Sequence, residues 1–519
     1  MVYMDLRINK EPVRSGERIC CCAQEQPIEL DYVLPDYYPE IFRIIKCCTE
    51  AEITACSVSG DKAVYELTVR LKIIYCPEDS RIPEAVEQKL VYSRTVSIEK
   101  AAENVCVYIK AVPDCVNCRA VNKRRIDVRG AVTVNICIMG ESETEVISEA
   151  FGSSIQLRKK SLVCPVQSIR AQKRVLVSDD FTLSETAPSV GTILRASAEI
   201  ISADKKIIAG KAAAKGELKI SVVYTSSEKT DSPVSSAQFS LPYSQLVELD
   251  GLNEDYLCHI DPSVISCTVI PRSDGDGSSR QLECEVMLFI DCLAVRMAER
   301  EIAVDEYSTA YASSHSGTEV RLEKQPEAVE SSFSVRGSCE SRDSSFAEIY
   351  EAYCDASGLK ASVEDGRLIA SGNVVLTVMG ETENGDFTIC ESEVSVNEVL
   401  AVSAQGISSE ADVRVNFSVI SCSYNITSDN TAEIKADITA RGRITDFSFE
   451  EALTEISVDD SAPREGQGDY ALRLYFAESG EELWDIAKKY GAAVSRIIEE
   501  NELDGDSVDE SAMLLIPLS

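Results

Sequence analysis

Upstream of about residue 460, apolar and polar residues alternate over many short segments, and turn-forming residues separate these segments. Leu368–Val378 is one such segment, and it follows a turn at Glu364–Gly366. Alternation places successive side chains on opposite faces of a strand. The pair Asn384 and Gly385 is typical of a tight hairpin turn. The pattern therefore predicts a mainly β body of antiparallel, β-sandwich-like units.

This body compares well with itself. Glu40–Ile53 resembles Glu348–Ala361, and Gly191–Ile200 is a weaker third copy. A second half-unit recurs as Pro262–Cys267 and Phe417–Cys422. Such internal similarity indicates three tandem β repeats, each with two related halves. The predicted divisions are residues 1–170, 171–325 and 326–458 for the repeats, 459–468 for a linker and 469–519 for a C-terminal module. The first copy at Pro39–Cys47 is compatible with a short helix or a buried strand.

The last fifty residues follow a different period. A short apolar strand ends near Gly480, and the apolar residues after it recur at helical spacing until Gly491, a residue typical of a helix C-cap. They are Leu483, Trp484, Ile486, Ala487 and Tyr490. A second short helix is expected over Val494–Asn501, and a closing apolar strand ends at Pro517. The order predicts a small β-α-α-β module in which Leu483, Ile486 and Ile498 form the core, with Trp484 packed among them.

The Gly-x-x-Leu-Trp-x-Ile-Ala-x-x-Tyr-Gly run at 480–491 resembles a LysM domain. That resemblance implies a binding module for N-acetylglucosamine chains, with a shallow groove between the first strand–helix loop and the loop before the last strand. Mapped onto this sequence, the ligand- or partner-binding residues are Gly480, Glu481, Glu482, Leu483, Asn501, Leu503, Asp504, Gly505 and Glu510.

The two loops depart from the LysM pattern. The usual Gly-Asp-Thr is Gly-Glu-Glu at 480–482, and the usual Pro-Gly-Gln is Glu-Ser-Ala at 510–512. Residues 475–519 carry three basic and 11 acidic side chains. A neutral sugar remains compatible with this charge, but anionic wall polymers are repelled. The departures favour a protein partner of basic character.

Charge also limits the partners of the whole chain. With 51 basic and 87 acidic side chains, the formal charge is −36. This field repels phosphate backbones and anionic lipid, so nucleic-acid binding is not expected. No apolar run approaches the roughly 18 residues of a membrane span, so membrane insertion is not expected either. An apolar content of 44% indicates a folded protein rather than an acidic disordered one.

Catalytic chemistry has few candidates. The two histidines are His259, next to Cys258 in an expected strand, and His315, in an expected exposed loop. Adjacent strand residues point to opposite faces, so Cys258 and His259 form a poor dyad. No nucleophile elbow, phosphate loop or dinucleotide motif is present. The sequence predicts no enzyme and no cofactor.

Metal binding has two weak candidates. Cys115 and Cys118 have the spacing of zinc ligands but lack a second pair at a suitable interval. The acidic loop at Asp274 resembles a calcium loop, except that Ser279 stands where such a loop needs Gly. We expect buried or turn cysteines in the first case, a hairpin loop in the second, and no metal.

Leu34–Ile44 has the pattern Leu-Pro-x-x-x-Pro-x-Ile-x-x-Ile. With the apolar strands that close each repeat and the LysM-like module, it makes the chain resemble the SPOCS-domain proteins of endospore-forming Firmicutes, the SipL-like spore-coat morphogenetic proteins. The resemblance implies a non-catalytic scaffold in spore-coat or spore-envelope assembly. Its LysM module would dock a spore-coat morphogenetic protein of the basement-layer ATPase type. The alternative is a peptidoglycan-binding protein of the cell wall or spore cortex.

The resemblance also implies a location in the mother-cell cytoplasm, with recruitment to the forespore surface. The N-terminal residues lack the basic start and apolar core of a secretory signal. The 20 cysteines include adjacent groups such as Cys20–Cys22, which do not look like a disulfide framework. We therefore expect a reducing compartment. Oxidation after mother-cell lysis, through Cys20–Cys22 in an expected exposed N-terminal segment, is a hypothesis for crosslinking.

Overall fold

The computed structural model describes residues 6–78, 80–98, 105–208, 210–228, 233–273, 279–341, 344–428, 430–464, 472–503, 505–508 and 510–517. In chain order, its elements are β1 (Arg7–Val33), β2 (Ile41–Ser59), β3 (Lys62–Pro77), β4 (Glu84–Ser97), β5 (Cys106–Pro113), β6 (Asn117–Asn122), β7 (Arg125–Phe151), β8 (Ile155–Thr182), β9 (Val190–Ile208), β10 (Lys211–Ser226), β11 (Val234–Glu248), β12 (Leu257–Arg272), β13 (Gln281–Ser308), β14 (Tyr311–Glu323), β15 (Glu327–Glu340), β16 (Phe346–Asp355), β17 (Lys360–Glu364), β18 (Arg367–Thr382), β19 (Phe387–Val399), β20 (Asp412–Ser428), β21 (Thr431–Thr445), β22 (Phe447–Pro463), β23 (Leu472–Ala477), α1 (Leu483–Tyr490), α2 (Val494–Asn501) and β24 (Ala512–Pro517).

Three β-sandwiches share one strand plan. In the first sheet of each, the opening strand pairs with the closing strand, which lies in the centre: β1-β7-β5, β8-β13-β12 and β15-β21-β20. The second sheets are β2-β3-β4, β9-β10-β11 and β16-β18-β19. In addition, β6 pairs with β7 in the first sheet of the first sandwich, and β17 pairs with β18 in the second sheet of the third. All these pairings are antiparallel. The prediction of a mainly β fold, with three tandem antiparallel sandwich units before a small β-α-α-β module, is confirmed. Pro39–Cys47, left open between helix and strand, enters strand β2.

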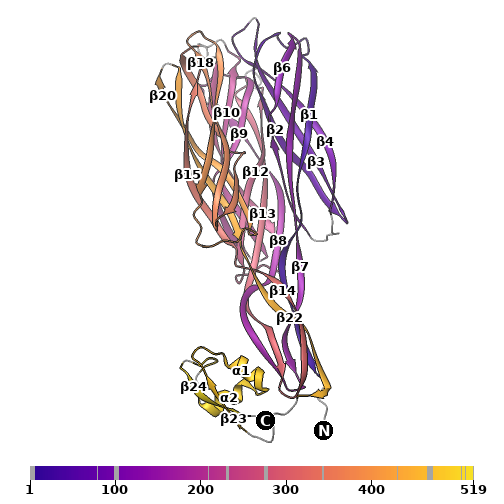
Figure 1. Ribbon diagram of the computed structural model, residues 1–519. Coiled ribbons are helices and arrows are strands. Elements are labelled where there is room, and N and C mark those ends of the chain that lie inside the picture. The colour runs from indigo at the N-terminus through magenta and orange to yellow at the C-terminus, as the bar shows by residue number, and fades with distance from the viewer. Residues whose placement is uncertain are drawn as a thin grey trace.

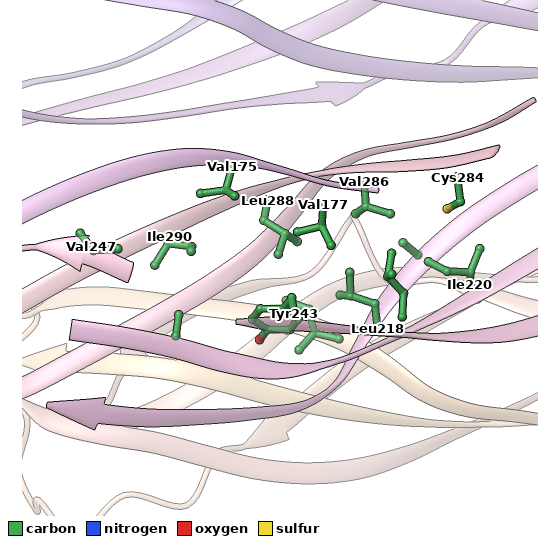
Figure 2. Close-up of a cluster of buried hydrophobic side chains, with 14 of the residues drawn as sticks. Val175, Val177, Leu218, Ile220, Tyr243, Val247, Cys284, Val286, Leu288 and Ile290 are labelled. Atoms are coloured by element: carbon green, nitrogen blue, oxygen red, sulfur yellow. The ribbon is translucent and has the colours of Figure 1, made fainter. Parts of the chain in front are cut away.

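The alternating residues of both sheets fill each sandwich. In the second one, Val286, Leu288 and Ile290 on β13 face Leu218 and Ile220 on β10, as Figure 2 shows. All five of these side chains are buried. Apolar burial at every second position explains why a period of two in the sequence predicts this architecture.

Four strands of the sandwiches, β1, β7, β8 and β13, extend beyond them and form a narrow stalk together with β14 and β22 (Figure 1). They pair as β1 with β7, β8 with β13, and β14 with β22. Their inward-facing side chains form one small core, to which every one of the six strands contributes: Val13, Val146, Cys164, Ile302, Val320, Leu322 and Ala452. Figure 1 shows the C-terminal module at the free end of this stalk, near both chain termini.

The strand pairs end at turns, and these turns do not all coincide with the predicted domain boundaries. β8 stays paired with β13 up to the pair Ile155 and Ser308, and β22 pairs with β14 up to Pro463 and Tyr311. The predicted repeat boundaries at 170/171 and 325/326 therefore fall inside β8 and between β14 and β15, and the predicted linker begins inside β22. The alternating pattern runs from sandwich into stalk without a break, so it marks no boundary there.

The three sandwiches meet at a shared centre. Ile74, Val223 and Met379, from the middle strands β3, β10 and β18, lie in one buried cluster. Arg443 of the third repeat, 2% exposed, donates to Asp291 of the second repeat at 2.5 Å and to Tyr108 of the first at 3.2 Å. A buried cation needs such partners because desolvation is costly. Among the described residues, no helix is long and apolar enough to cross a membrane.

Candidate functional site

The C-terminal module is built around its first helix. α1 ends at Gly491, whose φ of 67° is the left-handed geometry expected of a C-cap. Leu483, Ile486 and Ile497 are buried, and Ile498 packs against them. β23 and β24 form an antiparallel pair on which the helices pack. The predicted β-α-α-β order and its predicted core are confirmed.

The two loops of the predicted groove lie together and are joined by backbone hydrogen bonds. Gly480 donates to the carbonyl of Val508 at 2.8 Å, and Val508 donates to that of Glu481 at 3.0 Å. Leu483 donates to Asp506 at 2.9 Å. These groups are satisfied inside the module, so they are not available to a ligand without rearrangement.

The predicted site residues serve different purposes. Leu483 is fully buried, and Leu503 packs against the module core. Asn501 braces the fold: its amide donates to Leu515 at 2.8 Å and accepts from the Leu515 N–H at 2.7 Å. Gly505 and Glu510 are exposed. Asp504 lies outside the described residues.

Glu481 and Glu482, just before α1, have different partners: Glu481 bonds within the module and Glu482 pairs with the stalk. The Tyr475 hydroxyl donates to Glu481 at 3.0 Å, and this bond raises the pKa of Tyr475. Glu482 forms an ion pair of 2.5 Å with Arg158 on the stalk strand β8. The first loop thus faces the stalk on one side, a contact that the sequence did not reveal.

Trp484 lies at the junction between module and stalk. It is 9% exposed, and its ring meets Tyr307 of β13 edge-on, with centroids 4.9 Å apart. Its indole N–H donates to Asp305 at 2.8 Å, and Lys488 donates to the same carboxylate at 2.6 Å. Trp484 is buried, as predicted. However, one of the residues that cover it, Tyr307, belongs to the predicted second repeat.

The charge of Asp305 is stabilised at this junction. Burial alone opposes ionisation, but hydrogen bonds from Lys488, Trp484 and the Glu306 N–H outweigh it and hold the pKa of Asp305 below its usual value. The Tyr307 hydroxyl donates to Ala492 at 2.7 Å, and burial raises its pKa. Together these contacts fix α1 against the end of β13.

A second chain segment closes the junction. Arg464, just after β22, donates to the carbonyl of Ser308 at 2.9 Å and to that of Lys488 at 2.5 Å. It therefore ties the end of the stalk to the end of α1. No sequence pattern indicates the contact with Ser308, which lies 156 residues from Arg464 along the chain.

The opposite side of the module is apolar and exposed. Phe476 (65%), Leu474 (63%) and Leu472 (46%) alternate along β23, and Met513 (62%) stands opposite Phe476 on β24. Leu515 and Pro517, half-buried, complete this surface opposite Leu474 and Leu472. We call these six residues the outer sheet face. The sequence signal for it is the recurrence of Leu472, Leu474 and Phe476 at every second position of this strand.

The catalytic candidates lie apart from this site. His259 is buried in β12 beside Cys258, and burial, Lys205 and Arg443 lower its pKa to about 4. His315 was expected in an exposed loop; it is exposed, but the expected loop is wrong. It belongs to β14, opposite Ile456, with its Nδ1 3.1 Å from Glu306. The alternation of that strand is weak because its serines and glycine resemble a loop.

The cysteines are distributed through strands and core. Cys118 lies in β6 and Cys115 precedes it in an exposed turn. No cluster of three or more potential metal ligands occurs among the described residues. Most of the Asp274 loop, residues 274–278, lies outside them. Cys20–Cys22 were expected in an exposed N-terminal segment. They lie in β1, where Cys21 is exposed and its two neighbours are half-buried. Cys21 stands opposite Cys137, with their sulfurs 2.7 Å apart. Intermolecular crosslinking through this segment stays a hypothesis.

A large cavity of about 2110 Å³ lies between the three sandwiches. Arg195 and Lys46 line it, and both form ion pairs with the third repeat: Arg195 with Glu351 at 3.1 Å, and Lys46 with Glu391. Burial raises the pKa of Glu199, also in its wall, to about 7. These paired charges join the repeats to one another.

Comparison with protein-family models matches residues 40–121 and 189–270 to the SipL SPOCS domain, and residues 478–517 to the LysM domain. The two SPOCS segments begin at the second strand of the first two sandwiches. The third sandwich has the same strand plan without such a match. No curated protein and no solved structure matches the chain. Both kinds of domain are binding domains, which fits a sporulation-related role in binding protein or peptidoglycan.

Proposed function

We propose that this chain, which combines SipL SPOCS segments with a C-terminal LysM domain, is a non-catalytic scaffold in spore-coat or spore-envelope assembly. In this role the LysM module docks a coat protein, and the basement-layer ATPase of the coat is the partner that the SipL resemblance suggests. The setting proposed with it is the mother-cell cytoplasm, followed by recruitment to the forespore surface.

The state of the LysM loops carries the proposal. The LysM resemblance implies sugar contacts largely through backbone groups of these loops, and here several backbone groups of the two loops bond to one another across the groove. Glu482 is also held by Arg158 of the stalk. A protein partner does not need those backbone groups, because it can bind through side chains elsewhere on the module.

The arrangement of the three sandwiches and the stalk also supports a scaffold function. Buried ion pairs and a shared apolar centre join the three sandwiches, and the stalk places the LysM module at the opposite end (Figure 1). A long body with a binding module at one end can hold two partners apart. It offers sheet edges in the sandwiches and a separate surface on the module.

The second candidate is binding of peptidoglycan. The LysM match over residues 478–517 includes both loops of the groove, and this observation favours it. A neutral glycan is compatible with the acidic loops, whereas an anionic polymer is not.

A binding assay on the full chain separates the two functions. The chain is offered insoluble peptidoglycan and, separately, a purified basement-layer coat ATPase. The proposal expects saturable binding to the ATPase and none to the glycan. Saturable glycan binding without ATPase binding would establish the second candidate and remove the first.

A further inference from the structure

The module presents its outer sheet face away from every described contact with the rest of the chain. α1 contacts the stalk through Trp484 and Lys488, and the helices cover the inner side of the sheet. The outer side carries exposed side chains such as Phe476 and Leu474. Among the described strands, β23 and β24 pair only with each other.

This apolar surface is continuous rather than scattered. Strand register places Phe476 opposite Met513, Leu474 opposite Leu515, and Leu472 opposite Pro517. Side chains at directly opposed positions lie about 5 Å apart. Single exposed apolar residues are ordinary on protein surfaces, but a contiguous patch marks an interaction site.

The charges around the face indicate the sign of its partner. Residues 472–517 contain 11 acidic and four basic side chains. Three of the four basic ones are occupied on the helix side: Lys488 by Asp305, and Lys489 and Arg473 by the ring of Tyr490, at 5.4 and 5.1 Å from its centroid. At the end of the outer face stand the exposed Glu478, just after β23, and Glu510, just before β24.

The same acids disfavour a second copy of this chain as the occupant. Two copies related by a twofold axis would bring like patches together, and an axis along the strands would bring Glu478 and Glu510 of each copy close to those of the other. The net charge of −36 on each chain adds to this repulsion.

The length of the outer sheet face also bears on the shape of its partner. Six strand residues span about 20 Å, which is the length of an α-helix of about 13 residues. The inner side of this same sheet is already covered by short helices. The outer face therefore has the length and flatness that suit one amphipathic helix.

We infer that the outer sheet face docks an amphipathic helical segment of a partner protein, with an apolar stripe against Leu474, Phe476 and Met513 and basic side chains toward Glu478 and Glu510. The inference rests on the proposed protein-docking function and assigns the surface and the partner chemistry to it. The groove loops are not part of this surface.

The test uses the full chain and synthetic peptides in fluorescence anisotropy. The probe is a fluorescent 14-residue peptide of leucine and lysine arranged as an amphipathic helix. The comparison peptides are a scramble of the same composition and a version with glutamate in place of lysine. We expect the first to bind, the scramble at least tenfold more weakly, and the glutamate version not at all.

The decisive variant is the double substitution Leu474→Glu and Phe476→Glu. It adds two negative charges, which attract a basic peptide more strongly, so a loss of binding cannot come from weakened attraction. We expect at least tenfold weaker binding. Leu176→Glu, at an exposed β8 position, is the matched control and leaves binding unchanged. If the double variant shifts the emission of Trp484, Met513→Glu replaces it.

Several results would overturn the inference: equal binding by the parent and the double variant, equal binding of the scramble, or no binding of the amphipathic peptide. A concentration-dependent dimer in sedimentation velocity that the double variant abolishes would assign the face to a second copy instead. The coat ATPase distinguishes this inference from the proposed function. If the parent and the double variant bind the ATPase equally, the proposed scaffold function stands but the outer sheet face is not the docking surface. If the parent does not bind the ATPase, the proposed partner is wrong.

Discussion

The two sides of the LysM module differ in what covers their apolar surface. On the α1 side, Trp484 is covered by Tyr307, and Asp305 satisfies both its N–H and the charge of Lys488. On the sheet side, Phe476 and Leu474 are more than half exposed. One apolar surface is closed within the chain, and the other is left for a different molecule. The contacts on the α1 side fix the orientation of the module, and in this orientation its outer sheet face points away from the stalk.

Replacing Trp484 by Ala should reduce the stability of the module most, because it affects the covered side. It removes the largest side chain shared by the module core and the junction, so we expect a loss of about 3 to 5 kcal/mol in the stability of the module. Hydrogen–deuterium exchange of the full chain measures this as faster exchange in α1 and α2. Unchanged exchange in both helices would show that Trp484 is not part of the core.

Replacing Asp305 by Asn tests the polar part of the junction. The substitution preserves size but leaves Lys488 without its charged partner, so we expect a loss of about 1 to 3 kcal/mol in docking. Trp484 is the only tryptophan, so its emission reports the junction directly. We expect a red shift for Asp305→Asn and none for Asp485→Asn, an exposed acid of α1. Identical shifts in the two variants would contradict the assigned role.

Acid should open the same junction. The pKa of Asp305 is depressed in the folded protein, so its contribution is complete above the unfolded value of about 3.9 and is lost as pH falls through the lower folded value. A titration of Trp484 emission should therefore be flat from pH 7 to about pH 5 and change only below about pH 4. A transition centred near pH 6 would indicate another titrating group.

On the exposed side, the replacement of Phe476 by Ser should have the smallest effect. Because the side chain is 65% exposed, we expect a stability change within about 0.5 kcal/mol. Ile497→Ser, in the buried helix face, is the matched variant and should destabilise the module strongly. Thermal unfolding followed by Trp484 emission measures both. A large loss for Phe476→Ser would mean that the outer face is covered within the chain.

Local features of the sequence predicted the strands and helices, but contacts between residues far apart along the chain could not be predicted. Alternation such as that in Leu368–Val378 predicted the sandwiches because burial at every second position is a property of a single strand. Gly491 predicted the end of α1 for a similarly local reason. The junction was not predictable, because Asp305 and Trp484 are 179 residues apart.

The candidate site was predictable only in part. The LysM resemblance located the two loops, but not that Asn501 would brace β24 or that Glu482 would pair with the stalk. On β23, Leu472, Leu474 and Phe476 alternate with Arg473, Tyr475 and Ala477, so a period of two alone would assign the more apolar face to the core. Only the position of the helices identifies Leu474 and Phe476 as the exposed side.

Docking of a protein on the outer sheet face of the LysM module can be observed by hydrogen–deuterium exchange. The full chain is measured with and without the purified coat ATPase. We expect slower exchange in β23 and β24 in the complex, and no change in the loops at 479–483 and 505–508. Protection of those loops with β23 and β24 unchanged would contradict this expectation and return the binding site to the LysM groove.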